Sequence, residues 1–282
     1  PAARNAVRNT LTRSPLHGRW FLNDPDCLLL RPTTKLTPAE LQGILTVVAM
    51  CGGPVIVSDD MKELSLDRLR KLQVLLPPTG TSPVVLDLLH KEEPEELVIE
   101  IDEGAGAWDL VAVCNWGLVP KHCSLDVFQP FFRRISTPSG TTKLHLFDFW
   151  SGEYSQAELH DSSVRLLDPP SAVSPHSALL YAVRPLVPGK PEYVGSDLHF
   201  SCGKELVSWK ESAGEVTLEL NVEQRSASGH IWLYLPDTTM ASEVTCAGSA
   251  YGGQVYMVCP SVWRIVVSVE GHGSLSCKWE TP

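Results

Sequence analysis

The sequence predicts an α/β segment followed by an all-β region. Residues 2–80 hold two apolar stretches, each leading through polar residues into a helical pattern. From about residue 83 the apolar runs become short and alternate with polar residues, and turn-forming residues separate them. The chain has 282 residues, which is long enough for more than one domain. We expect units at residues 1–80, 83–188 and 189–282.

The first helix is predicted over residues 2–17. Ala3, Val7 and Leu11 recur at helical spacing and form one apolar stripe. Residues 19–30 then predict a strand that gains its polar residues near its carboxyl end. Because the chain begins at Pro1 in a segment typical of the middle of a protein, we expect a fragment or a processed product.

A second helix begins after Thr37, where Thr37, Pro38 and Glu40 form a capping-box sequence. It runs to about Met50 and ends at Gly52-Gly53. A short strand follows at residues 54–57, and another helix is predicted at 65–76, before two prolines. Strand, helix, strand and helix in this order indicate the repeating unit of a parallel α/β sheet.

The region after residue 83 shows no convincing helical periodicity. Its alternating runs, such as ELVIEI, DLVAVCNW and VWRIVVSV, are typical of an antiparallel β-sandwich. About 200 residues is large for one sandwich. We therefore predict two β-rich units, separated by a break at residues 185–191.

Composition excludes several classes of function. The formal net charge of −10 argues against nucleic acid as a main partner. The apolar stretches are shorter than the roughly 20 residues that span a membrane, so no membrane partner is expected. Eight cysteines show no CxxC pair, and His145, Asp148, His160, Asp161, His176 and His199 lack the tight spacing of metal ligands. We expect no metal and no cofactor; oligomeric state and compartment stay open.

Residues 20–31 read Trp-Phe-Leu-Asn-Asp-Pro-Asp-Cys-Leu-Leu-Leu-Arg, and TKLTPAEL, GGPVIVSDD and LLPP follow. These strings resemble the end of the catalytic barrel of clan D α-galactosidases, closest to the melibiase-like glycoside hydrolase family 36. LVAVCNW, HLFDFWSGEY and VGSDLHFSCGKELVSW resemble the C-terminal region of the same family.

The resemblance implies the C-terminal part of a (β/α)8 barrel, about two βα units, followed by an antiparallel β-sandwich region. It also implies retaining hydrolysis of terminal α-galactosides, with an α-galactoside-type carbohydrate as partner. The family's aspartate nucleophile and acid/base align upstream of Pro1. The isolated chain is therefore predicted to be inactive and to hold no catalytic residue.

Polar residues beside the two predicted strands are the candidate site residues. We expect them to line or support the active-site floor: Asn23, Asp24, Asp26, Arg31, Ser58, Asp59 and Asp60. On one strand, Asp24 and Asp26 would lie on the same face, with their Cα atoms about 6.6–7 Å apart. Their side chains would point in parallel. Such carboxylates cannot readily flank one glycosidic bond. For Asp24 and Asp26, a direct catalytic role and a purely structural role in a loop remain alternatives. For residues 58–60, the alternative is capping of the following helix.

Tryptophans offer a second type of site. Trp20 is predicted to pack in the core at the start of its strand. Core packing is favoured over a sugar-stacking platform for Trp108, Trp116, Trp150, Trp209, Trp232 and Trp263. If the platform interpretation held, the chain would be a non-catalytic carbohydrate-binding or interaction module, which is the alternative function.

Overall fold

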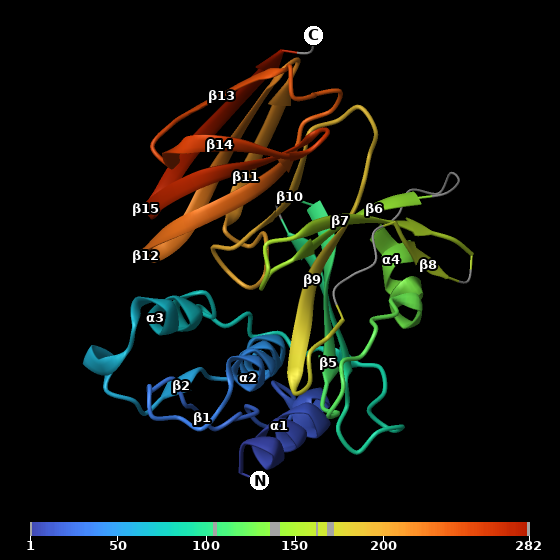
Figure 1. Ribbon diagram of the computed structural model, residues 1–282, viewed down its shortest axis with the longest axis vertical. Helices are drawn as coiled ribbons and strands as arrows, with labels where there is room; N and C mark the ends of the chain where they lie inside the picture. Colours follow the sequence, from blue (N-terminus) through green and yellow to red (C-terminus); the bar gives the residue numbers. More distant parts are fainter. Residues whose placement is uncertain (1, 104–105, 136–141, 162, 168–171, 281–282) are drawn as a thin grey trace.

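The computed structural model describes residues 2–103, 106–135, 142–161, 163–167 and 172–280. β-Strands arranged in sheets are the predominant secondary structure of this described part, and helices are few. Figure 1 shows the N-terminal helices beside a central sheet, with a second large sheet at the C-terminal end. No described helix has the length and apolar character needed to cross a membrane.

The first eighty residues contain three α-helices and one small sheet among their described positions. Their bounds are α1 Ala2–Arg13, β1 Cys27–Leu28, α2 Pro38–Met50, β2 Ile56–Val57 and α3 Leu66–Gln73, with 3₁₀ turns at Ser14–Leu16 and Met61–Glu63. Strands β1 and β2 pair in parallel, with Cys27 opposite Ile56 and α2 connecting them. This is the predicted order of elements. Its assignment to a (β/α)8 barrel stays a prediction.

The capping box of α2 is confirmed. Thr37 Oγ1 accepts a hydrogen bond from the Glu40 backbone N–H at 3.2 Å, and Glu40 Oε2 accepts one from the Thr37 N–H at 2.8 Å. Two of the helix's unpaired N-terminal donors are satisfied in this way. The helix start was predictable because every partner lies within four residues.

The strand predicted at residues 19–30 is wrong over most of its length. Only Cys27–Leu28 form a strand, because Asp26 has a φ of 70° and turns the chain immediately before them. Phe21 makes just an isolated bridge with His17. Trp20, predicted to be in the core, is 83% exposed. The first helix ends at Arg13, four residues early, where Pro15 enters a 3₁₀ turn. Helix α3 likewise ends at Gln73 rather than at residue 76.

Seven antiparallel strands form the central sheet. In spatial order they are β3 Val84–Val85, β4 Glu96–Glu103, β5 Gly106–Asn115, β9 Ser177–Pro185, β6 Thr142–Asp148, β7 Tyr154–Leu159 and β8 Val164–Leu166. A 3₁₀ turn at Asp126–Phe128 leads into the short helix α4, Gln129–Ile135. Helix α4 was not predicted, because its seven residues make too few turns to show a helical period in the sequence.

Both faces of this central sheet are buried. On β5, Leu110 belongs to the core shared with α2, whereas Val111 belongs to the core shared with α4. The prediction of antiparallel strands after residue 83 is therefore confirmed. Helices α2 and α4 pack on the two faces of this sheet. Its assignment to a β-sandwich stays a prediction.

The C-terminal sheet has six strands in its described residues. They are β10 Glu192–Ser196, β11 Leu206–Ser212, β12 Glu215–Tyr234, β13 Glu243–Ala247, β14 Tyr251–Cys259 and β15 Val262–Glu280. The long strands β12 and β15 pair along most of their length, with an irregularity between Asn221 and Ser226. Their apolar side chains enclose a separate core that includes Leu218, Ile231 and Val267. The domain boundaries near residues 83 and 189 stay predictions.

Candidate functional site

Asn23 fastens the segment before β1 to helix α1. Its Nδ2 donates to the Thr10 carbonyl oxygen at 2.8 Å, and its backbone N–H donates to His17 Nδ1 at 2.9 Å. The Asn23 side chain is buried. Its polar groups are consequently used within the fold, and they hold the loop that carries Asp24 and Asp26.

Asp24 and Asp26 do not share a strand face, so that expectation is wrong. Both precede β1 at its amino end, and both side chains accept hydrogen bonds from the local backbone. Asp24 Oδ1 accepts from the Asp26 N–H at 2.9 Å, and Asp26 Oδ1 accepts from the Cys27 N–H at 2.7 Å. These are the local bonds by which Asp stabilises turns.

Asp59 and Arg31 meet at the opposite, carboxyl end of the two parallel strands. Asp59 Oδ2 accepts from the backbone N–H groups of Leu30 at 2.5 Å and Arg31 at 3.0 Å. Asp59 Oδ1 lies 3.5 Å from Arg31 Nη1, and the Asp59 side chain is 0% exposed. One carboxylate therefore ties the chain leaving β1 to the chain leaving β2.

Ser58 and Asp60 flank this carboxylate and are exposed. Asp60 caps the following 3₁₀ turn, because its Oδ1 accepts from the Lys62 N–H at 2.9 Å. The structure thus separates the seven candidates into two groups. Asn23, Asp24 and Asp26 lie before β1, whereas Arg31, Ser58, Asp59 and Asp60 lie after β1 and β2. Their assignment to an active-site floor stays a prediction.

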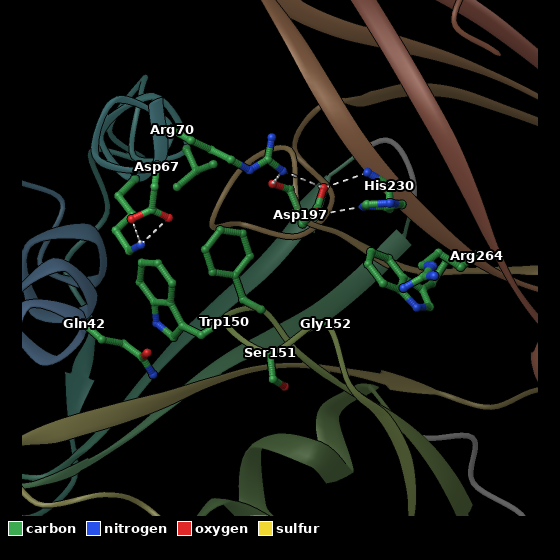
Figure 2. Close-up of a pocket in the computed structure, with 13 residues that line it drawn as sticks. Gln42, Asp67, Arg70, Trp150, Ser151, Gly152, Asp197, His230 and Arg264 are labelled. Atoms are coloured by element: carbon green, nitrogen blue, oxygen red, sulfur yellow. Dashed lines mark hydrogen bonds and ion pairs between the residues drawn. The ribbon is translucent and has the colours of Figure 1, made fainter. Parts of the chain in front are cut away.

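A cavity of about 340 Å³ lies where α2, α3, the β6–β7 turn and the C-terminal sheet approach one another. Figure 2 shows its lining side chains. They come from six segments that are distant from one another in the sequence. They include Gln42 on α2, Asp67, Arg70 and Lys71 on α3, Trp150, Ser151 and Gly152 in the β6–β7 turn, Asp197 after β10, His230 on β12 and Arg264 on β15.

A charged cluster forms one wall of the cavity. Asp197 Oδ1 lies 3.1 Å from Arg70 Nη2, and Asp197 Oδ2 lies 2.9 Å from His230 Nδ1 (Figure 2). The same carboxylate accepts from the His230 backbone N–H at 2.7 Å. A Cβ at Gly229 would collide with Asp197, so glycine allows this close approach. Arg70 also donates to the Ser228 carbonyl oxygen.

An aromatic wall faces the charged cluster. Trp150 Nε1 donates to Thr46 Oγ1 on α2 at 2.8 Å, and the Trp150 ring packs edge-on against Phe149 with centroids 5.0 Å apart. Trp232 lies deeper and packs on Phe147 with centroids 4.5 Å apart. Trp150 is only partly buried, which leaves part of an indole ring to the cavity.

Asp148 fixes the turn that carries Trp150 into the cavity. Its carboxylate accepts from the Trp150 N–H at 3.2 Å and from Ser151 Oγ at 2.8 Å. Burial raises the pKa of Asp148 from 3.8 to about 6, although the bonds from Ser151 and Trp150 oppose the rise. Geometry at this wall consequently depends on a carboxyl group that titrates in weakly acidic solution.

The sequence did not predict that Asp197, Arg70 and His230 are neighbours. They are joined only by the packing of α3 against the C-terminal sheet, and no short-range pattern connects positions so far apart. Trp150 and Trp232 were considered as sugar platforms. The burial of Trp108, Trp232 and Trp263 agrees with the favoured core interpretation for those three. In the part of the chain that the structure describes, no cluster of His, Cys, Asp or Glu could hold a metal ion.

No protein-family model matches the chain. Several solved glycosidase structures resemble it in part. They include an α-galactosidase from Saccharomyces cerevisiae with raffinose, at 15% identity, 64% coverage of this chain, 51% of that chain and a TM-score of 0.42. Another is α-galactosidase I from Mortierella vinacea, at 12% identity, coverage of 64% and 44%, and a TM-score of 0.44.

A putative α-N-acetylgalactosaminidase from Bacillus halodurans is similar at 16% identity, with coverage of 64% and 44% and a TM-score of 0.45. This chain therefore spans about half the length, or less, of the solved structures that it resembles.

Replacing Asp59 by Ala is expected to lower the free energy of unfolding by about 2 kcal/mol, since the Leu30 and Arg31 N–H groups lose their acceptor. Asp60→Ala is the matched control, and loses one capping bond in an exposed turn, at a cost of under about 1 kcal/mol. Urea unfolding of the two variants measures the difference. Equal losses would show that Asp59 does not join the two strands.

The contribution of Asp148 to the free energy of unfolding is expected to fall as pH rises from 3.8 to about 6, because folded Asp148 holds its proton more tightly than unfolded Asp148 does. Within that window each pH unit costs roughly 1.4 kcal/mol for this one group. Asp148→Asn should reduce the slope. Part of the pH dependence should remain in this variant because of Asp109, since burial raises the pKa of Asp109 to about 6 as well. Urea unfolding at a series of pH values measures both slopes, and identical slopes would contradict this role of Asp148.

Proposed function

We propose that this chain is the C-terminal portion of a glycoside hydrolase resembling the clan D α-galactosidases, which act on terminal α-galactosides with retention. One observation carries the proposal. The Trp20–Arg31 string contains β1, and α2, β2 and α3 follow it in the order of two consecutive βα units with parallel strands. The string that resembles a barrel end therefore occurs beside the topology that a barrel end requires.

The surroundings of β1 support the idea that further strands complete this part. Two parallel strands alone leave both backbone edges unpaired, and parallel sheets are normally larger and covered. Beside them, Trp20 is 83% exposed and Leu22 72% exposed. Adjacent large apolar side chains on a surface are typical of a contact region. We propose that upstream barrel elements cover them.

The carboxylates near β1 and β2 support the proposal that catalysis needs residues upstream of Pro1. A retaining glycosidase uses two carboxyl groups about 5–5.5 Å apart, one as nucleophile and one as acid/base. Asp24 and Asp26 bind backbone N–H groups of their own loop, and Asp59 binds those of Leu30 and Arg31 after β1. Asp59 and Arg31 would then shape the active-site floor, at the ends of the seventh and eighth strands of the proposed barrel. They would not attack the sugar.

The test compares the natural protein, including its upstream residues, with residues 1–282 on a chromogenic α-galactoside. We expect hydrolysis by the longer protein and none by the 282-residue chain, since the nucleophile and acid/base are absent from the latter. Hydrolysis by residues 1–282 would overturn the placement of that pair. Asp24 and Asp26 would then be the first residues to replace.

The cavity favours a second candidate function, a non-catalytic carbohydrate-binding module. We infer it from the pairing of a partly exposed indole at Trp150 with charged and amide groups at Asp67, Arg70 and Gln42. Sugar rings present apolar C–H faces to aromatic rings and hydroxyl groups to polar side chains. The volume of about 340 Å³ is at the lower end of small-molecule sites.

Titration calorimetry of residues 1–282 with methyl α-galactoside tests this second candidate. Asp67→Ala is expected to weaken binding about tenfold, equivalent to about 1.4 kcal/mol, because one hydroxyl acceptor is removed. Asp67 is an exposed helix residue, so its loss leaves the core intact. Asp102→Ala, at an exposed Asp on β4, is the matched control. Absence of measurable binding by the parent chain would remove this candidate.

A further inference from the structure

Two of the cysteines face each other across neighbouring strands of the C-terminal sheet. Cys246 on β13 is the register partner of Cys277 on antiparallel β15. The side chains of the two residues are within hydrogen-bonding reach of one another. Both are thiols in this structure. This arrangement was not visible in the sequence, where 30 intervening residues separate the two positions.

The backbone shows which kind of cross-strand pair this is. The Trp279 N–H donates to the Gly214 carbonyl oxygen at 2.9 Å, on the side of β15 that faces β12. Backbone groups of alternate residues point to the same side, so the N–H and C=O of Cys277 also face β12 and away from β13. On the opposite side, the Ser274 carbonyl oxygen accepts from the Ala250 N–H at 3.0 Å, as this alternation requires.

Cys246 and Cys277 therefore form a non-hydrogen-bonded antiparallel pair. In such a pair the Cα atoms are about 4.5 Å apart and the side chains come closest. A disulfide accepts Cα separations of roughly 4.4–6.8 Å. The backbone of β13 and β15 thus already provides the spacing that a cross-strand disulfide needs.

The two thiols differ in access. Cys246 is partly exposed, whereas Cys277 is fully buried. Its hydrogen bond with Cys246 and its burial both raise the pKa of the Cys277 thiol. Cys246 is consequently the sulfur that an external reagent can reach first, and Cys277 is placed to attack it afterwards.

We propose that Cys246 and Cys277 are a disulfide-forming pair, oxidised by thiol–disulfide exchange with a small-molecule disulfide such as glutathione disulfide. The Cys246 thiolate attacks one glutathione sulfur, forms a mixed disulfide and releases one glutathione thiolate. The Cys277 thiolate then attacks Cys246 Sγ and releases the second glutathione. Both cysteines are oxidised, the glutathione disulfide is reduced, and the two cysteine protons leave on two glutathione thiols.

The bond would fasten an edge strand. Within the described residues β13 lies at the end of the strand order β10-β12-β15-β13 and pairs only with β15. The linked loop would contain the whole of β14. Edge strands are the part of a sheet most open to fraying and to pairing with other chains. The cross-link would hold β13 in register under oxidising conditions.

Peptide mapping of residues 1–282 tests the proposal. The protein is equilibrated with oxidising glutathione, alkylated and digested with trypsin, which cuts after Arg225, Arg264 and Lys278. We expect peptide 226–264 linked to peptide 265–278 in the oxidised sample, and separate alkylated peptides after reduction. The oxidised protein should also unfold at a higher temperature than the reduced protein.

Cysteine variants identify the sulfur involved, since peptide 226–264 also contains Cys259. Cys246→Ser should abolish the linked peptides and the rise in unfolding temperature, whereas Cys259→Ser, the matched control on β14, should retain both. The proposal fails if the parent chain gives no linked peptides. It fails equally if the link persists in Cys246→Ser or disappears in Cys259→Ser. Because Cys246 is partly exposed, its replacement by Ser does not depend on repacking a core.

Discussion

The packing of α2 between the N-terminal elements and the central sheet is the constraint on which the rest of the structure depends. Its buried side chains, such as Leu41, Leu45 and Val48, belong to one core that continues from α1 into β4, β5 and β9. Gly43 permits this close approach, because a Cβ there would lie 2.9 Å from the His176 carbonyl oxygen. Gln42 Nε2 then donates to the Ala178 carbonyl oxygen at 2.7 Å. The hydrophobic stabilisation depends on the apolar area that the N-terminal helices and the central sheet bury against each other. Neither layer therefore keeps its core without the other.

The cavity in Figure 2 is a consequence of that packing. Once α2 is seated, α3 must run beside the C-terminal sheet, where the Val74 carbonyl oxygen accepts from the Phe200 N–H at 3.0 Å. Polar side chains from α3 and from the C-terminal sheet then meet at the cavity, beyond the edge of the apolar core. The Asp197 carboxylate, bound by Arg70 and His230, is partly solvated rather than buried. Pairs of this kind contribute only modestly to stability.

Features determined by neighbouring residues were predictable from the sequence, and features determined by distant partners were not. The capping box at Thr37 and Glu40 was predicted because it closes within one turn. The length of β1 was not, because the left-handed turn at Asp26 depends on its own carboxylate and on pairing with β2. The seven candidate residues lie beside β1 and β2, but Asn23, Asp24 and Asp26 precede β1 instead of lying near the carboxyl end of their strand as predicted. Their division between opposite ends of the strands required the register, which sequence periodicity cannot supply.

A buried cation at the junction of the two large sheets specifies how they meet. Arg184 on β9 lies 4.1 Å from the Trp108 ring centroid and donates to the Cys202 carbonyl oxygen at 3.0 Å. Burial lowers the pKa of Arg184 to about 10, which leaves the guanidinium charged at neutral pH. Gly203 leaves room for it, because a Cβ there would collide with the guanidinium. Desolvating a cation is costly, and an apolar side chain would fill the same space without that cost. What the apolar replacement could not do is select one orientation, since hydrogen bonds and ring stacking are directional whereas hydrophobic contact is not. Arg184 therefore orients the C-terminal sheet on the central sheet, and with it the wall of the cavity that Asp197 and His230 provide.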